Sequence, residues 1–582
     1  MRFILDMVHH NPGEPPFASR FLDPAHLADY GFNGQVFKHI NCIATFAQLG
    51  VDVFPAGTPE RAWLDDFTPG IEREIAAAKA RGLMVFYHID LFVLPRRLVE
   101  HFRSEICDPV SGRILLDRPR TLEIHRVLFA ELRARFPEVD GYIIRVGETY
   151  LFDTPHHVGN GPIPRLGPAW SPTYHYAETL GGTQAGPVWT PAQVEAYVTL
   201  LQLLRDEVCV RHDRMVFFRT WDIFPDKLHA RLDHYLEVTE RIAPHPKLVF
   251  SIKHTALDFW RRVKVNECLT QGRHRQIIEV QCQREYEGKG AYPNYVMGGV
   301  INGFEENAVK IGLKDMLGHP LISGVYGWSR GGGWYGPYIP DEFWPDLNAY
   351  VLARFVAHPS RSEELILQDY AVGKIGLVPE DARRFRRLCL LSARAILLGR
   401  QCEAFDRELH EEVLPAACWM RDDRLGGRGQ LAVVLRFLAD HGRLDCALAE
   451  KAEAVRIWEE ITALAGAIRW PDGSCGEFVR VSAEYGRLLF EIIYQGWRVL
   501  ISGQRDDDPA ELAEAIGRYD ERWQEYRALA ANPLCASLYH GEYFSLPGAP
   551  AAPGMDESVA YYKMRLAAGG AGLLSKASID LA

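Results

Sequence analysis

The chain has 582 residues, of which 47% are hydrophobic and 24% charged, a balance typical of globular proteins rather than disordered ones. Its length exceeds what one hydrophobic core usually supports, so two or more domains are expected. The formal net charge of −11, without a basic patch, argues against nucleic acid or an acidic membrane as a partner.

The N-terminal segment and the cysteines bear on localisation. The chain begins with one Arg and a short apolar run interrupted by Asp6, which is too brief and too polar for a secretory signal. No stretch approaches the roughly 18 apolar residues of a membrane span. The eleven cysteines are scattered without a CxxC pair, which favours reduced thiols over a disulfide framework or a zinc knuckle. We therefore expect a cytoplasmic protein.

Short apolar runs alternate with helical patterns over the first part of the chain, which indicates βα units around a parallel sheet. The runs with strand character are eight, the number that closes a (β/α)8 barrel, at Phe3–Val8, Gly34–Ile40, Leu83–Leu91, Gly141–Val146, Met215–Trp221, Leu248–Lys253, Ile277–Gln283 and Gly324–Trp328. Val51–Pro55 is assigned to a loop insertion. A helix is predicted over Pro69–Arg81, because Pro stands at its start and Gly82 follows its end.

Two domains follow from this pattern. Residues 1–345 are predicted to form the barrel, with a long Gly-, Pro- and aromatic-rich loop at about 149–190 after the fourth strand. Residues 346–582 carry helical apolar spacing and few β-like alternations, so a mostly α-helical C-terminal domain is expected. This domain could also pair two copies of the chain in a homodimer. The segment 546–554 reads as a linker.

Charged residues interrupt several predicted strands near their C-terminal ends, the end of a barrel that carries active sites. The fourth strand leads to Arg145 and Glu148, the fifth contains Arg219, the sixth leads to Lys253 and Asp258, and Glu285 follows the seventh. Burying such groups is costly, and their convergence on one rim indicates a functional site.

The chemistry of these side chains narrows the function. Carboxylates on separate strands are what glycoside hydrolysis requires, one to protonate the leaving oxygen and one to activate water or attack. Neighbouring Arg and Lys indicate a substrate that is itself anionic, since guanidinium groups bind carboxylates bidentately. The nearby aromatic residues are candidates for stacking on sugar rings, namely Trp221, Trp328, Trp334 and Tyr335.

At these residues the chain resembles the α-glucuronidases of glycoside hydrolase family 67. The stretch GYIIRVGE matches the family's cation and general acid after strand four, and FFRTW matches its Arg in strand five. Lys253 stands five residues before Asp258, as in the family, and REYEG places Glu285 a further 27 residues on. The resemblance covers roughly residues 1–390. The family's N-terminal β-sandwich is not expected, since the first barrel strand begins at Phe3.

The resemblance implies an inverting glycoside hydrolase of polysaccharide degradation, which releases terminal α-linked glucuronic acid from oligosaccharides. Glu148 would be the general acid. Asp258 and Glu285 would hold the attacking water, with the base role open between them. Arg145, Arg219 and Lys253 would bind the uronate carboxylate, with Trp221 and Trp328 as further substrate contacts.

Two other functions remain open. A metal-dependent barrel hydrolase is suggested by the histidines and the carboxylate near the rim, although the two adjacent histidines after the first strand would diverge: His9, His10, His88, Asp90, His156 and His157. A catalytically silent protein that binds uronate oligosaccharides is the second. The Gly-rich runs do not follow a strand and open a helix, so a dinucleotide is not expected. No cofactor and no metal are predicted.

Overall fold

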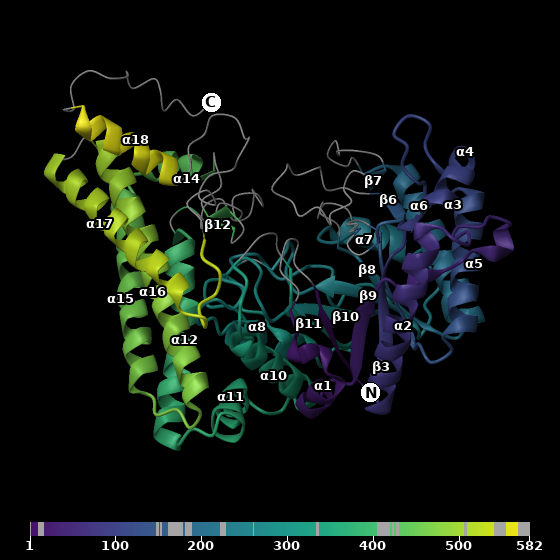
Figure 1. The fold of residues 1–582 in the computed structure, drawn as a ribbon, viewed down its shortest axis with the longest axis horizontal. Helices are drawn as coiled ribbons and strands as arrows, with labels where there is room; N and C mark the ends of the chain where they lie inside the picture. The colour runs from purple at the N-terminus through teal and green to yellow at the C-terminus, as the bar shows by residue number, and fades with distance from the viewer. Residues whose placement is uncertain are drawn as a thin grey trace.

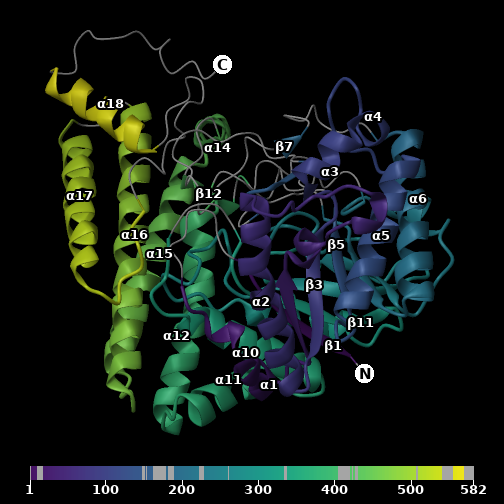
Figure 2. The same ribbon diagram turned by 45° about the vertical axis from the view of Figure 1, so that its right-hand side comes forward.

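The computed structural model describes residues 2–9, 17–146, 151, 154–160, 179–180, 189–221, 228–259, 261–332, 337–403, 405, 420–421, 424–425, 430–505, 509–539 and 555–568. The chain forms a barrel lobe and, beside it, a lobe of long helices (Figure 1), and a second view shows the same arrangement (Figure 2). None of the helices in this part of the chain is both long and apolar enough to cross a membrane. The cysteines within the same residues are all free thiols.

Eight parallel strands close the barrel in the order β1-β11-β10-β9-β8-β5-β3-β2. All eight predicted strands are confirmed, with shifts of a few residues at some ends. Their bounds are β1 Phe3–Val8, β2 Gly34–Lys38, β3 Met84–Asp90, β5 Gly141–Arg145, β8 Met215–Arg219, β9 Leu248–Lys253, β10 Arg275–Gln281 and β11 Ile322–Arg330. Residues 51–55 form no strand, as expected of a loop insertion.

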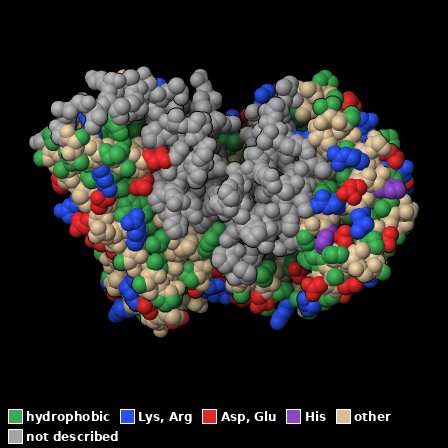
Figure 3. Space-filling view, turned by 45° about the horizontal axis from the view of Figure 1, so that its top comes forward, with side chains coloured by type: hydrophobic (Ala, Val, Ile, Leu, Met, Phe, Trp, Pro, Cys, Tyr) green, Lys and Arg blue, Asp and Glu red, His purple; other side chains and the backbone are tan. Residues whose placement is uncertain are grey.

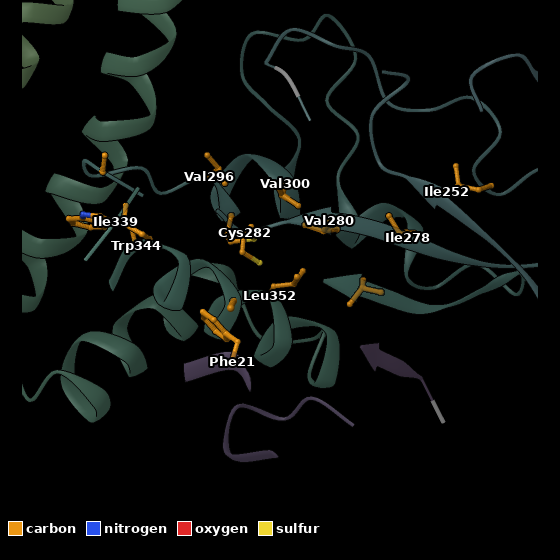
Figure 4. Close-up of a cluster of buried hydrophobic side chains, with 14 of the residues drawn as sticks. Phe21, Ile252, Ile278, Val280, Cys282, Val296, Val300, Ile339, Trp344 and Leu352 are labelled. Carbon is orange, nitrogen blue, oxygen red and sulfur yellow. The ribbon is translucent and has the colours of Figure 1, made fainter. Parts of the chain in front are cut away.

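The strands are apolar on both faces because each face packs against other side chains. One face fills the barrel interior with a separate cluster that includes Leu5, Phe86, Ile143, Phe217 and Ile277. The other face packs against the surrounding helices. Figure 4 shows this second layer, in which side chains of β9 and β10 meet those of the neighbouring helices: Ile252, Ile278, Val280, Val300 and Leu352.

Helices surround the barrel. Their bounds are α1 Pro24–Tyr30, α2 Pro59–Ala80, α3 Arg96–His101, α4 Arg103–Ile106, α5 Pro119–Arg135, α6 Pro191–Leu203, α7 Leu232–Thr239, α8 Met297–Asn302, α9 Leu313–Met316 and α10 Phe343–Ala357. Short 3-10 turns occupy Arg20–Leu22, Ile40–Ile43 and Ala47–Leu49, and a π-helical segment, Leu204–Arg211, continues α6. Helix α10 packs on β11 and β1 and runs through the predicted boundary at residue 345.

The predicted start of the second helix is wrong. Helix α2 begins at Pro59, ten residues before Pro69, which lies inside it. The side chain of Thr58 accepts a hydrogen bond from the backbone N–H of Arg61, so a complete N-cap with Pro at the first helical position stands upstream. Pro69 resembles a start signal in sequence, but the chain is already helical there.

The long connection after β5 contains short strands, although it was predicted as a loop. Strand β6, His157–Asn160, pairs with β4, Leu94–Pro95, and with β7, Thr179–Leu180, in a small separate sheet. The remaining residues of the connection before Trp189 lie largely outside the described ranges.

The C-terminal part of the chain is largely helical. Its helices are α11 Glu363–Asp369, α12 Pro379–Arg400, α14 Gln430–Asp440, α15 Leu444–Ala467, α16 Gly473–Arg505, α17 Pro509–Ala528 and α18 Met555–Ala567, with a π-helical turn at Tyr370–Lys374, a 3-10 turn at Leu529–Ala531 and a two-residue pair of strands, β12 Met420–Arg421 and β13 Arg424–Leu425. Helices α12, α15, α16 and α17 pack in succession (Figures 1 and 2). The predicted linker at 546–554 lies outside the described residues.

The segment after β10 reaches from the barrel into the helical lobe. Its Tyr292 is buried edge-on against Trp458 of α15 and Phe490 of α16, at centroid distances of 5.6 and 5.7 Å. Nε of Arg400, the last residue of α12, donates a hydrogen bond of 2.9 Å to the Tyr292 hydroxyl. The helical lobe therefore anchors the segment that also carries Glu285.

The described surface of both lobes mixes charges of both signs. Figure 3 shows Lys and Arg side chains interspersed with Asp and Glu, over the barrel lobe as well as the helical lobe. On the face that Figure 3 shows, the described residues form no large patch of one sign.

Candidate active site

The C-terminal mouth of the barrel carries a ring of polar and charged side chains. Successive residues of a strand point to opposite faces, so the residue two positions beyond an interior apolar residue also points inward. Phe86 is followed in this way by His88 and Asp90, and Phe217 by Arg219. The same register places further inward groups on neighbouring strands: Lys38, Arg145, Ser251, Lys253, Glu279 and Gln281.

Arg145, at the end of β5, is held by the carboxylate of Asp90 on the adjacent strand β3. Nη2 of Arg145 donates a hydrogen bond of 2.7 Å to Oδ2 of Asp90, and Nε donates to Oδ1. The two residues are register partners, and both are nearly inaccessible to solvent. This bidentate pair fixes the guanidinium at the mouth, where sequence reasoning placed it.

Arg219 of β8 forms a second bidentate pair, with Glu279 of β10. Both hydrogen bonds are 2.8 Å, and both side chains are completely buried. The Ser251 hydroxyl donates a further hydrogen bond of 2.8 Å to Glu279. Burial alone would raise the pKa of Glu279, but the charge and hydrogen bonds of Arg219, together with Lys253 and Ser251, outweigh it and lower that pKa.

Aromatic rings line the mouth next to these charges. The guanidinium of Arg219 lies 4.9 Å from the ring centroid of Trp328 on β11, and the ring of His9 stacks on Trp328 at a centroid distance of 5.9 Å. The ammonium of Lys253 lies 3.6 Å from the ring centroid of Trp221 and 4.6 Å from that of Phe259. Such faces bind cations and also stack on sugar rings.

Lys253 and Asp258 form a third pair. Nζ of Lys253 donates to Oδ1 of Asp258, and the Tyr286 hydroxyl donates a hydrogen bond of 2.8 Å to Oδ2. Asp258 keeps 15% of its side-chain surface exposed, more than the carboxylates of the other two pairs. This carboxylate is therefore oriented from both sides and still reaches solvent.

Glu285 is placed by the turn that follows β10. Its backbone N–H donates a hydrogen bond of 2.7 Å to Oε1 of Gln281, and the Gln281 amide donates to the carbonyl of Gly331 at 3.1 Å. Gly332 has a φ of +97°, and a Cβ there would lie 2.7 Å from Oε2 of Glu285 and 2.4 Å from Nε2 of Gln281. The glycine run after β11 thus lets the chain approach this carboxylate closely.

The structure brings together most of the predicted site residues. Four of the eight lie on barrel strands: Arg145, Arg219, Lys253 and Trp328. Trp221 and Asp258 lie in the segments that follow β8 and β9. Glu285 follows β10. Glu148 lies outside the described residues, as do Trp334 and Tyr335.

Sequence reasoning did not assign the groups that hold these residues in place. Ser251, Phe259 and Tyr286 are not among the residues that the sequence predicts for the site. Strand parity would have found Ser251, because it stands two residues before Lys253 on the same face of β9. Tyr286 and Phe259 carry no such signal, since both lie in irregular segments.

The histidines of the metal hypothesis are dispersed. His157, on β6, bonds to the backbone carbonyl of Cys42 at 2.9 Å, whereas Nδ1 of His88 faces the sulfur of Met7 at 3.4 Å. His10 is outside the described residues. Within the described ranges no group of three or more His, Cys, Asp and Glu side chains is arranged to hold a metal ion.

No family model matches this sequence, and no curated protein sequence does either. Among solved structures the chain is similar to a GH138 enzyme targeting pectin rhamnogalacturonan II, at 12% identity and a TM-score of 0.51, over 97% of this chain and 68% of that one. An O-GlcNAc hydrolase variant of Thermobaculum terrenum matches at 10% identity and a TM-score of 0.35, over 97% and 94% of the two chains. CpGH84B matches at 8% identity and a TM-score of 0.37, over 96% of this chain and 76% of that one. The first of these likenesses shows a shared fold, a (β/α)8 barrel followed by a helical region, with an enzyme that acts on a glycan.

Proposed function

We propose that the protein is a glycoside hydrolase that releases terminal α-linked glucuronic acid from oligosaccharides with inversion of configuration. The observation that carries this proposal is the convergence of carboxylates and cations at one mouth of a barrel. Asp258 and Glu285 follow adjacent strands, Asp258 is paired with Lys253, and two further buried pairs, Arg145–Asp90 and Arg219–Glu279, lie at the same mouth. The fold shared with a glycoside hydrolase supports the general class.

The charge at the mouth supports an anionic sugar as the substrate. Burial and then the charges of Arg145, Arg219, Lys38 and His9 push the pKa of His88 well below its ordinary value. After burial, the causes of this shift are cations that lie at the mouth. These cations would favour a ligand carboxylate, despite the negative charge of the chain as a whole.

The proposed mechanism divides the work among three carboxylates. Glu148, which lies outside the described residues, would protonate the glycosidic oxygen as the bond breaks. Asp258 and Glu285 would hold a water molecule on the opposite face of the sugar, and one of them would take its proton during attack. Lys253 and Tyr286 orient Asp258 for this task, since each binds a different oxygen of its carboxylate.

The cations would recognise the substrate carboxylate. Arg145 and Arg219 are held rigidly by Asp90 and Glu279, so little conformational entropy is lost when a ligand binds beside them. Lys253 would complete the contact, and Trp221 and Trp328 would stack on the sugar ring.

The test is hydrolysis of aldouronic oligosaccharides and aryl α-glucuronides by the purified protein, followed by proton NMR during the first turnovers. We expect β-glucuronic acid as the first product, because water attacks opposite the leaving group. Initial release of the α-anomer would instead indicate retention. Binding of these sugars without turnover would identify a silent binding protein and reject the enzymatic proposal.

A further inference from the structure

His88 is a buried group at the barrel mouth that the proposed mechanism does not use. It lies on β3, two residues beyond Phe86, whose side chain belongs to the interior cluster of the barrel. Its ring therefore points inward above that cluster, and only 3% of its surface is exposed. Its register partners are Lys38 on β2 and Ile143 on β5, so it lies one step along β3 below the Asp90–Arg145 pair.

The contacts of Met7 determine which ring nitrogen carries the proton. Nδ1 of His88 lies 3.4 Å from the thioether sulfur, and the Tyr326 hydroxyl donates to the same sulfur at 2.9 Å. A thioether has no hydrogen to donate, so this contact is a hydrogen bond only when Nδ1 carries the proton, and we assign the proton there. Nε2 then presents a lone pair.

This Nε2 atom is buried and has no hydrogen-bond partner within the part of the chain that the structure describes. Burying an unpaired polar atom costs stability, so such atoms are rare in proteins unless a ligand or water completes them. Ring nitrogens of His157, His212, His254 and His274 are also without a described partner. His88 differs from them because it lies on the inner face of the barrel, beside Lys38 and two residues beyond Phe86, and this place points to a ligand.

The neighbours of His88 exclude two other roles. The charges of Lys38 on β2, Arg145 on β5, Arg219 on β8 and His9 after β1 act with burial to keep the imidazole neutral. A neutral ring is neither a partner for the substrate carboxylate nor a proton donor at the glycosidic oxygen. What remains is a hydrogen-bond acceptor of fixed direction.

We propose that Nε2 of His88 accepts a hydrogen bond from one hydroxyl group of the bound uronic acid, and that this contact selects among sugars that differ at that hydroxyl. The proposal rests on the proposed function for the identity of the sugar. A site built to pair with a hydroxyl discriminates against an analogue that lacks it, because its own polar group is then left unpaired.

The first experiment needs no substrate. Long-range ¹⁵N NMR spectra of histidine-labelled protein report the tautomer and charge of each imidazole, and the spectrum of His88→Gln identifies the signal of this residue. We expect a neutral ring protonated at Nδ1 and no titration near the ordinary histidine pKa of about 6.5. A proton on Nε2, or a titration close to that value, would overturn the inference.

The second experiment couples the residue to the hydroxyl. Wild type, His88→Phe and His88→Gln are compared on an aryl α-glucuronide and on its 2-, 3- and 4-deoxy derivatives. For the wild type, one derivative should lose about 10- to 100-fold in kcat/KM. His88→Phe should lose a similar factor on the parent and become indifferent to that one hydroxyl, whereas the amide oxygen of His88→Gln should restore part of the activity.

A matched control replaces another buried histidine of the barrel lobe. His125 on α5 bonds to the carbonyls of Thr121 and Leu91, and its replacement by Phe tests whether loss of a buried imidazole alone produces these effects. An equal loss for His88→Phe on the parent and on every deoxy derivative would reject the inference while leaving the proposed function intact. Absence of wild-type activity on every α-uronide would reject the proposed function, and the NMR experiment would still decide the state of His88.

Discussion

The hydroxyl of Tyr286 donates a hydrogen bond of 2.8 Å to Oδ2 of Asp258 and so joins the segment after β10 to the segment after β9. Tyr286 directly follows Glu285 in the chain. The bond that orients one candidate base therefore also fixes the backbone that carries the other. The proposal that Asp258 and Glu285 share one water depends on this relationship.

Tyr286→Phe should lower kcat on α-glucuronides by about 10-fold, since a hydrogen bond to a charged group contributes roughly 1.5–3 kcal/mol and the ring itself remains. Steady-state kinetics measures the loss. Tyr87→Phe is the matched control, because Tyr87 donates a 3.1 Å hydrogen bond to Glu74 on the outside of the barrel. It should change stability and leave kcat near the wild-type value. Equal losses of activity in both variants would contradict the role of Tyr286.

Glu148→Gln should abolish cleavage of natural oligosaccharides while substrate binding is largely kept. Loss of a general acid costs about 10²–10⁴ in rate. An aryl α-glucuronide with a good leaving group should be affected less, because its departure needs less protonation. Comparing the two substrate classes in the same variant provides the check, and near-full activity on oligosaccharides would show that another group is the acid.

The charge at C6 of the sugar should decide the substrate. Sites built around a polar group reject an analogue lacking it by about 10⁴–10⁵, and we expect α-glucosides to be at least about 10³ poorer than α-glucuronides in kcat/KM. Lys253→Met and Arg219→Ala should narrow this gap, mainly by damaging the uronide reaction. Comparable rates on neutral and acidic substrates would remove the argument for a uronidase.

Those two substitutions also break buried ion pairs, so stability must be measured beside activity. Lys253→Met leaves Asp258 without its cation, and Arg219→Ala does the same to Glu279. Each should cost about 3–5 kcal/mol of unfolding free energy. The double variant Arg219→Met with Glu279→Gln should recover part of that stability without recovering activity, which separates folding from recognition.

Gly332→Ala should reduce activity far more than Gly31→Ala. Both glycines have a φ of +97°, so both substitutions carry the same backbone strain. A Cβ at Gly31 meets nothing within 4 Å, whereas one at Gly332 would press on Gln281 and Glu285. Thermal unfolding and kcat/KM of the two variants give the comparison. Equal activity in both would show that the position of Glu285 does not matter.

Acid should destabilise the protein from about pH 6.5 downward. Burial lowers the pKa of His157, His229 and His254 to about 3, while the unfolded chain titrates near 6.5. Between these values the unfolded state binds protons that the native state does not, so the unfolding free energy falls as pH falls, by up to about 1.4 kcal/mol per pH unit for each group.

Glu279 acts in a lower window. The pKa of Glu279 is lowered in the folded state. Its contribution to the unfolding free energy is therefore complete at a pH above the ordinary glutamate pKa and is lost as the pH falls through the lowered pKa. Urea unfolding at about pH 7, 6 and 5 therefore reports the histidines together with Asp6 and Glu74, whose pKa burial raises to about 7 and which oppose the histidines in this window. His157→Gln should reduce the slope of the unfolding free energy against pH by one proton, and an unfolding free energy that rises toward pH 5 would contradict this account.

The sequence by itself determined the barrel and the placement of its charged residues. Strands buried on both faces need continuous apolar runs, so all eight barrel strands could be recognised from such runs, as at Phe3–Val8 and Leu248–Lys253. Because parallel strands end at one mouth, Arg145, Arg219 and Lys253 could be assigned to a common site before their contacts were known. The start of α2 could not be assigned correctly, since Pro69 and Pro59 give the same local signal.

Only the tertiary structure decided what each charged group contacts. Arg219 and Glu279 are 60 residues apart, and Tyr286 meets Asp258 across two irregular segments, so no local pattern specifies either contact. The tautomer of His88 depends on Met7, which lies 81 residues away on another strand. Side-chain pairing at a barrel mouth follows from strand order, register and burial acting together, and these exist only when the barrel has closed.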